Sequence, residues 1–186
     1  MPNSQLKRLF ISLNLPKDAK NKIAAAIINK LSDKNKGVKW VNPAGLHFTL
    51  HFLGDLNKIQ TDEVKKIMGS LEKKFKKMEF NLNYIKAFPN SNRPRIIFLQ
   101  GQQTNGDSVF KLQAELGKKL IKIGLKIDRR IWQPHITLGR VKFGQININF
   151  TKINEVKFNI DTYSLTESQL EPAGPRYTEV IGFKLL

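Results

Sequence analysis

The feature that most constrains this chain is a short phrase that occurs twice. The segments LHFTL (residues 46–50) and PHITL (residues 134–138) each place a threonine two residues after a histidine and a leucine directly after that threonine. Only three histidines are present, so two of the three carry the pattern. Alternation of polar and apolar residues is typical of a strand with one face in the core. Nearly half the chain separates the two phrases, which predicts two similar halves that place equivalent strands about a pseudo-two-fold axis.

Further strands and a few helices are expected between and after these phrases. Alternating or β-rich runs predict strands at 9–15, 38–41, 46–53, 80–88, 95–99, 135–141, 156–160, 163–170 and 177–185. Helical spacing predicts helices at 16–31 and 108–124, and a third that Thr61 caps and that carries an apolar face as far as Phe75. Interspersed helices and more numerous strands indicate an α+β fold with mostly antiparallel pairing. No linker divides the chain, so we expect residues 1–186 to form one domain.

Composition narrows the chemistry and the partners. The chain contains no cysteine, which excludes disulfides, thiolate catalysis and cysteine-containing metal centres. Its formal net charge of +17 attracts polyanions, so nucleic acid is the expected partner. The alternative is that the lysine-rich surface serves only solubility. No apolar run is long enough to span a membrane, and we expect no membrane contact and a cytoplasmic protein.

The paired phrases indicate phosphoryl chemistry. Side chains two apart on a strand share a face, so His47 with Thr49, and His135 with Thr137, each present an imidazole and a hydroxyl to one surface. Across a cleft, one neutral imidazole can take a proton from water and one imidazolium can protonate a departing alkoxide. The hydroxyls can donate hydrogen bonds to phosphate oxygens, and Arg140 is close enough to share that anion. The spacing alone does not assign acid and base.

The third histidine is interpreted differently. By strict alternation His51 shares the face of His47, but about 13 Å separates the two in an extended strand. That distance and the scarcity of nearby carboxylates argue against a metal site. We therefore expect neither metal nor cofactor, and we interpret His51 as a structural or cleft-edge residue.

Several basic and aromatic residues outside the phrases are weaker candidates. Arg95, in an RPR run, and Arg130, in an RR pair, either contact an RNA backbone or are simply solvated. Tyr177, beside an arginine, is a candidate to stack on a base, with a packing role as the alternative. Trp40 and Trp132 are expected to be packing residues.

The two phrases resemble the paired H-x-T-x motifs of the 2H phosphoesterase superfamily. Most of the chain is similar to one branch of it, the RNA 2′,3′-cyclic phosphodiesterases, also called 2′-5′ RNA ligases. The similarity continues, in order, in RLFI (8–11), LP (15–16), WV (40–41), FLG (52–54), FP (88–89), RPR (93–95), Ser168, Leu170, Gly174 and Tyr177. The slight departures include Trp132, where the branch often has phenylalanine.

This resemblance implies a bilobal α+β fold in which two mostly antiparallel sheets, flanked by helices, enclose an active-site cleft. It also implies metal-independent hydrolysis of a terminal 2′,3′-cyclic phosphate to a 2′-phosphate. By motif position, His47 would protonate the leaving 3′ oxygen and His135 would activate the water. Thr49, Thr137 and Arg140 would hold the phosphate.

The expected substrate is therefore an RNA with a 2′,3′-cyclic phosphate end, such as a tRNA fragment, and the expected protein is a monomer. Reverse 2′-5′ ligation is the same chemistry run backwards, and the high concentration of water favours hydrolysis. Two alternatives remain open: a non-catalytic RNA-binding module, and a phosphodiesterase that acts on small cyclic nucleotide phosphates. The high positive charge favours the longer polyanion, because each neutralised phosphate releases counterions.

Overall fold

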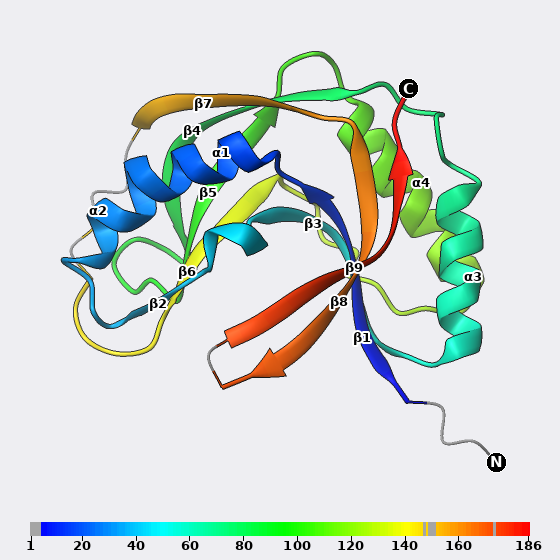
Figure 1. Ribbon diagram of the computed structural model, residues 1–186, viewed down its shortest axis with the longest axis horizontal. Coiled ribbons are helices and arrows are strands. Elements are labelled where there is room, and N and C mark those ends of the chain that lie inside the picture. Colours follow the sequence, from blue (N-terminus) through cyan, green and yellow to red (C-terminus); the bar gives the residue numbers. More distant parts are fainter. Residues whose placement is uncertain (1–4, 147, 149–151, 173) are drawn as a thin grey trace.

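The fold is built on two antiparallel sheets that face each other across the middle of the molecule (Figure 1). The computed structural model describes residues 5–146, 148, 152–172 and 174–186. One sheet has the order β3-β1-β8-β9 and consists of β3 (His47–Leu56), β1 (Lys7–Asn14), β8 (Thr162–Glu171) and β9 (Gly174–Lys184). The other has the order β2-β6-β5-β4-β7 and consists of β2 (Val38–Trp40), β6 (His135–Val141), β5 (Ile96–Gln103), β4 (Met78–Phe88) and β7 (Lys152–Ile160). The expected α+β class with two antiparallel sheets is confirmed.

Helices cover the outer sides of both sheets (Figure 1). The helical segments are α1 (Lys17–Ile23), the π-helical η1 (Ala24–Ile28), α2 (Asn29–Ser32), the 3-10 turn η2 (Pro43–Gly45), α3 (Lys58–Gly69) and α4 (Ser108–Lys122). The first three run on continuously and lie along the five-stranded sheet, where α1 contacts β7. The helices α3 and α4 contact each other and cover the four-stranded sheet through β9 and β3.

The sheets do not follow the two halves of the sequence. The C-terminal strand β8 pairs with the N-terminal β1, and β9 pairs with β8, whereas β2, β4 and β5 join β6 and β7 in the other sheet. The helices are exchanged as well, since α1 follows β1 in the chain but packs on the five-stranded sheet. The two histidine-bearing strands, β3 and β6, thus lie in different sheets, and the chain crosses repeatedly between the sheets.

One expected helix boundary is wrong. Thr61 does not cap α3; Asn57 does, because its Oδ1 accepts a hydrogen bond from the backbone N–H of Gln60 at 2.9 Å. The Gln60 Oε1 accepts from the Asn57 N–H at 3.1 Å, which completes a capping box. Thr61 is buried inside the helix. The helix ends at Gly69, so the apolar pattern that continues to Phe75 belongs to the following turn.

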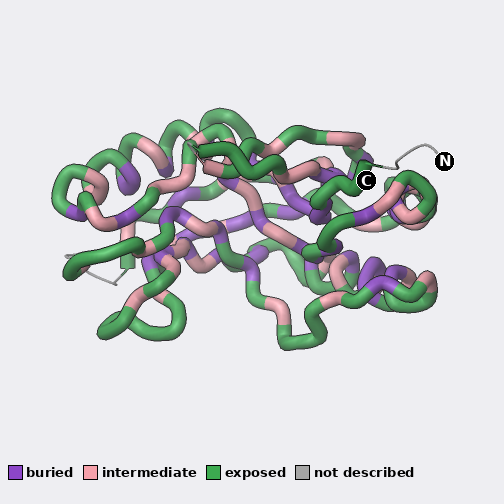
Figure 2. The backbone as a smooth tube through the Cα atoms, turned by 90° about the horizontal axis from the view of Figure 1, so that it is seen from below, coloured by how far each residue is buried: buried purple, intermediate pink, exposed green. Residues whose placement is uncertain are grey.

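A single apolar core joins the sheets, and Figure 2 shows buried residues concentrated along the central strands. Phe48 of β3 is fully buried, and its ring centroid lies 4.6 Å from that of Phe80 on β4 and 6.3 Å from that of Phe158 on β7. Gly101 of β5 makes this approach possible, because a Cβ there would come within 2.8 Å of the Phe48 ring. Phe48 thus packs one sheet against the other directly behind the first histidine phrase.

Candidate active site

The two histidines lie at the first residues of β3 and β6, which come from different sheets and contact each other. Phe48 and Ile136, which follow them, are fully buried, whereas His47 is partly exposed and His135 is exposed. Thr49 lies on the same face as His47, and its Oγ1 is 3.1 Å from His47 Nε2. The hydrophobic effect on the alternate residues thus turns an imidazole and a hydroxyl of each strand away from the core.

Both imidazoles are held in the same way by the backbone. His47 Nδ1 lies 2.7 Å from the carbonyl oxygen of Gly45, and His135 Nδ1 lies 2.9 Å from the carbonyl oxygen of Gln133. A carbonyl only accepts, so each Nδ1 carries the hydrogen and donates it. Each Nε2 is therefore the nitrogen left to exchange a proton. Both carbonyls belong to the residue two before the histidine, so the two imidazoles are held by equivalent contacts.

A bulge on β3 separates His51 from the site. Thr49 and His51 lie opposite consecutive residues of β1, so Leu50 is the extra residue of a bulge. The bulge reverses the alternation, and His51 is only 4% exposed. Its Nε2 lies 2.8 Å from the Gln113 carbonyl on α4 and donates to it. The expectation that His51 shares the face of His47 is therefore wrong, and the structural interpretation of this residue agrees with its environment.

A matching bulge on β6 changes the face on which Arg140 lies. Thr137 and Gly139 lie opposite consecutive residues of β5, which makes Leu138 the extra residue. Arg140 is five residues after His135, and strict alternation would place it on the opposite, buried face. The bulge restores it to the exposed face. Each phrase thus has a bulge at its leucine, one burying a histidine and the other exposing a guanidinium.

Aromatic rings enclose His47. The Phe10 ring centroid is 4.8 Å from that of His47, and the Tyr177 ring meets His47 edge-on at 5.1 Å. Burial raises the pKa of the Tyr177 hydroxyl above its ordinary value, and the charges of Arg140 and Arg8 partly oppose this rise. Tyr177 thus packs against His47, where the charges of Arg140 and Arg8 reach its hydroxyl.

Burial lowers the pKa of His47 below its ordinary value. The hydrogen bond to the Gly45 carbonyl opposes this shift, whereas the charge of Lys20 and the electrostatic interaction with the second imidazole, His135, add to it. The lowered pKa favours the neutral imidazole of His47 in the free protein. A phosphate anion between the two histidines would act in the opposite direction and raise the pKa.

A polar cavity of about 190 Å³ opens beside His47. Its lining includes Lys20 of α1, Asn14 of β1, Thr166 of β8 and Glu179 of β9. None of these was expected from sequence. They come from four elements and carry no common motif, so only their convergence in space identifies them.

Two other candidates, Arg95 and Arg130, and the expected packing residue Trp132 lie in different environments. Arg95 is exposed, and its carbonyl accepts from the N–H of Val141, so it flanks the end of β6 next to Arg140. Arg130 is exposed, and its Nε donates to Asp128 at 3.0 Å, so its charge is already paired. Trp132 packs edge-on against Phe110 on α4, and its Nε1 donates to the Thr49 carbonyl at 2.7 Å. This bond ties the backbone of the first phrase, at Thr49, to the loop that precedes the second phrase.

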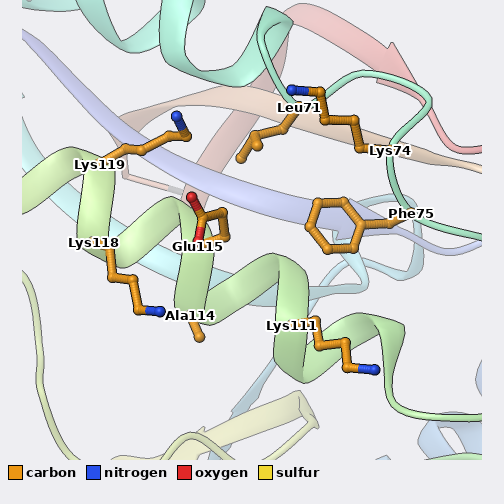
Figure 3. Close-up of a pocket in the computed structure, with 8 residues that line it drawn as sticks. All are labelled: Leu71, Lys74, Phe75, Lys111, Ala114, Glu115, Lys118 and Lys119. Carbon is orange, nitrogen blue, oxygen red and sulfur yellow. The ribbon is translucent and has the colours of Figure 1, made fainter.

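A larger cavity of about 430 Å³ lies away from the histidines, between α4 and the turn after α3 (Figure 3). Its lining includes Phe75, one carboxylate, from Glu115, and four lysines: Lys74, Lys111, Lys118 and Lys119. It contains no histidine and none of the residues that the motifs predict. The residues that the structure describes contain no cluster of three or more potential metal ligands and no helix long and apolar enough to cross a bilayer.

The paired histidines, their threonines and the two-sheet frame define a two-histidine phosphoesterase. Residues 13–98 match the family described as LigT like Phosphoesterase. A Methanocaldococcus jannaschii protein named RNA 2′,3′-cyclic phosphodiesterase is 34% identical over 183 residues, which cover 94% of this chain and 98% of the relative. The chain belongs to the LigT-like phosphoesterase family.

Solved structures of low sequence identity share the fold. The protein TT0787 of Thermus thermophilus superimposes with a TM-score of 0.85 at 23% identity, covering 95% of this chain and 97% of that one. E. coli LigT in its apo form superimposes with a TM-score of 0.77 at 20% identity, covering 98% and 99%. The bilobal fold expected from the resemblance is thus confirmed over nearly the whole chain.

Proposed function

We propose that this protein hydrolyses the terminal 2′,3′-cyclic phosphate of RNA to a 2′-phosphate, with His47 as proton donor and His135 as proton acceptor. The observation that carries the proposal is the matched pair of imidazoles, each with Nδ1 held by a backbone carbonyl and Nε2 left to exchange a proton. The names of relatives such as the M. jannaschii protein support the substrate, and so does the net charge of +17.

The proposed reaction is an in-line displacement at phosphorus. His135 Nε2 takes a proton from water as the water oxygen bonds to phosphorus. The bond from phosphorus to O3′ breaks on the opposite side, and His47 Nε2 gives its proton to O3′. Thr49, Thr137 and Arg140 stabilise the charge on the non-bridging oxygens. Solvent then returns a proton to His47 and removes one from His135.

The test is product identification on an oligoribonucleotide that ends in a 2′,3′-cyclic phosphate, with a chelator present. The expected product carries a 2′-phosphate and a free 3′ hydroxyl. A 3′-phosphate would reverse the regiochemistry of the proposal. RNA binding without turnover would instead support the non-catalytic module.

The pKa of His47 gives a second prediction. Because burial lowers it, the free protein should show His47 titrating below pH 6.5 by NMR, so that lowering the pH through that pKa protonates the ring. Inorganic phosphate should raise the pKa, because the anion stabilises the imidazolium.

His51 is the internal control for this titration. Burial lowers its pKa too, but the residue lies on the other face and bonds to α4, so phosphate should leave it unchanged. A His47 pKa at or above 6.5 in the free protein, or one that phosphate does not move, would contradict the assigned environment.

A further inference from the structure

The cavity beside His47 contains a cationic side chain at a defined position. Lys20, on α1, is half-buried, and its Nζ donates a hydrogen bond to the Ala44 carbonyl at 2.6 Å. Ala44 belongs to η2, the same turn whose Gly45 carbonyl holds His47 Nδ1. The turn therefore fixes the ammonium and the imidazole together on the wall of one cavity.

The charge of Lys20 is not neutralised by the protein. An ammonium has three N–H donors, and the Ala44 carbonyl takes one. Among the residues that the structure describes, no carboxylate lies within 4.0 Å of this ammonium. Glu179 also lines the cavity, but its Oε2 accepts from Ser164 at 2.6 Å and from Asn14 at 3.2 Å. A half-buried cation without a counterion is costly, and an anionic ligand would offset that cost.

The chemistry of the substrate indicates which anion this is. In a 2′,3′-cyclic phosphate end, both hydroxyls of the terminal ribose are esterified to the reacting phosphorus. The other anionic group on that nucleotide is the phosphodiester at O5′, which joins it to the RNA chain. In-line displacement places the leaving O3′, and hence the ribose, on the side of the proton donor. With His47 as donor, the ribose and its 5′ phosphodiester lie on the side of the cavity that contains Lys20.

We propose that Lys20 binds the phosphodiester on the 5′ side of the terminal nucleotide and so makes the site select the end of an RNA chain over a nucleoside 2′,3′-cyclic phosphate. The inference rests on the proposed function and adds a specificity-determining residue to it. On this inference, one side chain, that of Lys20, makes the enzyme prefer RNA ends to small cyclic phosphates.

The test compares two substrates with the same terminal base: a dinucleotide that ends in a 2′,3′-cyclic phosphate, and the corresponding nucleoside 2′,3′-cyclic phosphate. Wild-type protein should prefer the dinucleotide. Lys20→Met should lower kcat/KM for the dinucleotide by roughly 10- to 100-fold, the size expected for lost hydrogen bonds to a charged group. The nucleoside substrate should change by less than about threefold, because it lacks the 5′ phosphodiester.

The ratio of the two kcat/KM values isolates this contact from the effect of Lys20 on His47. Loss of the lysine charge raises the pKa of His47, but it does so for both substrates and cancels in the ratio. Lys20→Arg retains the charge and should retain the preference. Lys22→Met, an exposed lysine on the same helix, should change neither substrate.

Two results would overturn the inference while leaving the proposed function intact. Equal losses on both substrates in Lys20→Met would make Lys20 only a support for η2 and His47. Equal kcat/KM values for the two substrates in wild-type protein would show that the 5′ phosphodiester is not recognised. If wild-type protein turned over neither substrate, the proposed function would be overturned, and this inference with it.

Discussion

Alanine in place of His47 is expected to lower kcat/KM on a 2′,3′-cyclic phosphate end by roughly 10²–10⁴-fold, the usual contribution of a positioned general acid. The substitution removes the Nε2 that exchanges the proton and leaves the Gly45 carbonyl and the Thr49 hydroxyl without their imidazole partner. His135→Ala should cause a loss of similar size, because the reaction needs both an acid and a base. Steady-state rates at several substrate concentrations measure the effect.

His51→Gln is the matched control for these two variants. The native His51 lies four residues from His47 on the same strand, but it is buried on the opposite face and donates to the Gln113 carbonyl. Glutamine keeps a donor of that kind, so turnover should stay close to wild type. If His47→Ala kept more than about a tenth of the wild-type rate, the loss would be too small for a general acid and would contradict the role assigned to His47.

Phe48→Ala is expected to cause the largest loss of stability, about 3–5 kcal/mol in the free energy of unfolding. The ring is fully buried and lies against Phe80 and Phe158 of the other sheet, in space that Gly101 leaves free. Its removal leaves a cavity at the junction of the two sheets. Urea denaturation followed by circular dichroism measures the change.

Phe52→Ala provides the comparison on the same strand. Phe52 is 66% exposed, so its truncation should cost less than about 1 kcal/mol. We further propose that residues 1–186 unfold as one domain, because Phe48 joins both sheets in one core. Phe48→Ala should then shift a single cooperative transition. Two transitions, of which only one moves, would contradict a single domain.

The motif predicted which side chains of the two phrases face the core, because that depends on local geometry. Side-chain alternation on a strand is set within a few residues, so His47 with Thr49, and the buried Phe48 between them, follow from the sequence. The absence of cysteine and the high charge limited the chemistry and the partner just as directly. The cap of α3 was predictable as well, since Asn57 and Gln60 form a recognisable capping box that the choice of Thr61 overlooked.

Alternation failed at the two bulges. Whether a strand contains an extra residue depends on the neighbouring strand with which it pairs. The residues around Leu50 and Leu138 do not indicate that pairing. The consequence was large at both sites. His51 moved from the expected site face into the core, and Arg140 came to the face that strict alternation denies it.

The sequence by itself determined the chemical groups: two imidazoles with paired hydroxyls, on two strands that each bury their alternate residues. The tertiary structure alone decided how those groups are surrounded. Lys20, Asn14 and Glu179 reach the cavity of His47 from α1, β1 and β9 because the chain crosses between sheets, so segments far apart in sequence share one wall. Burial lowers the pKa of His47, the hydrogen bond to the Gly45 carbonyl opposes the shift, and the charge of Lys20 adds to it; all three are properties of the packed fold.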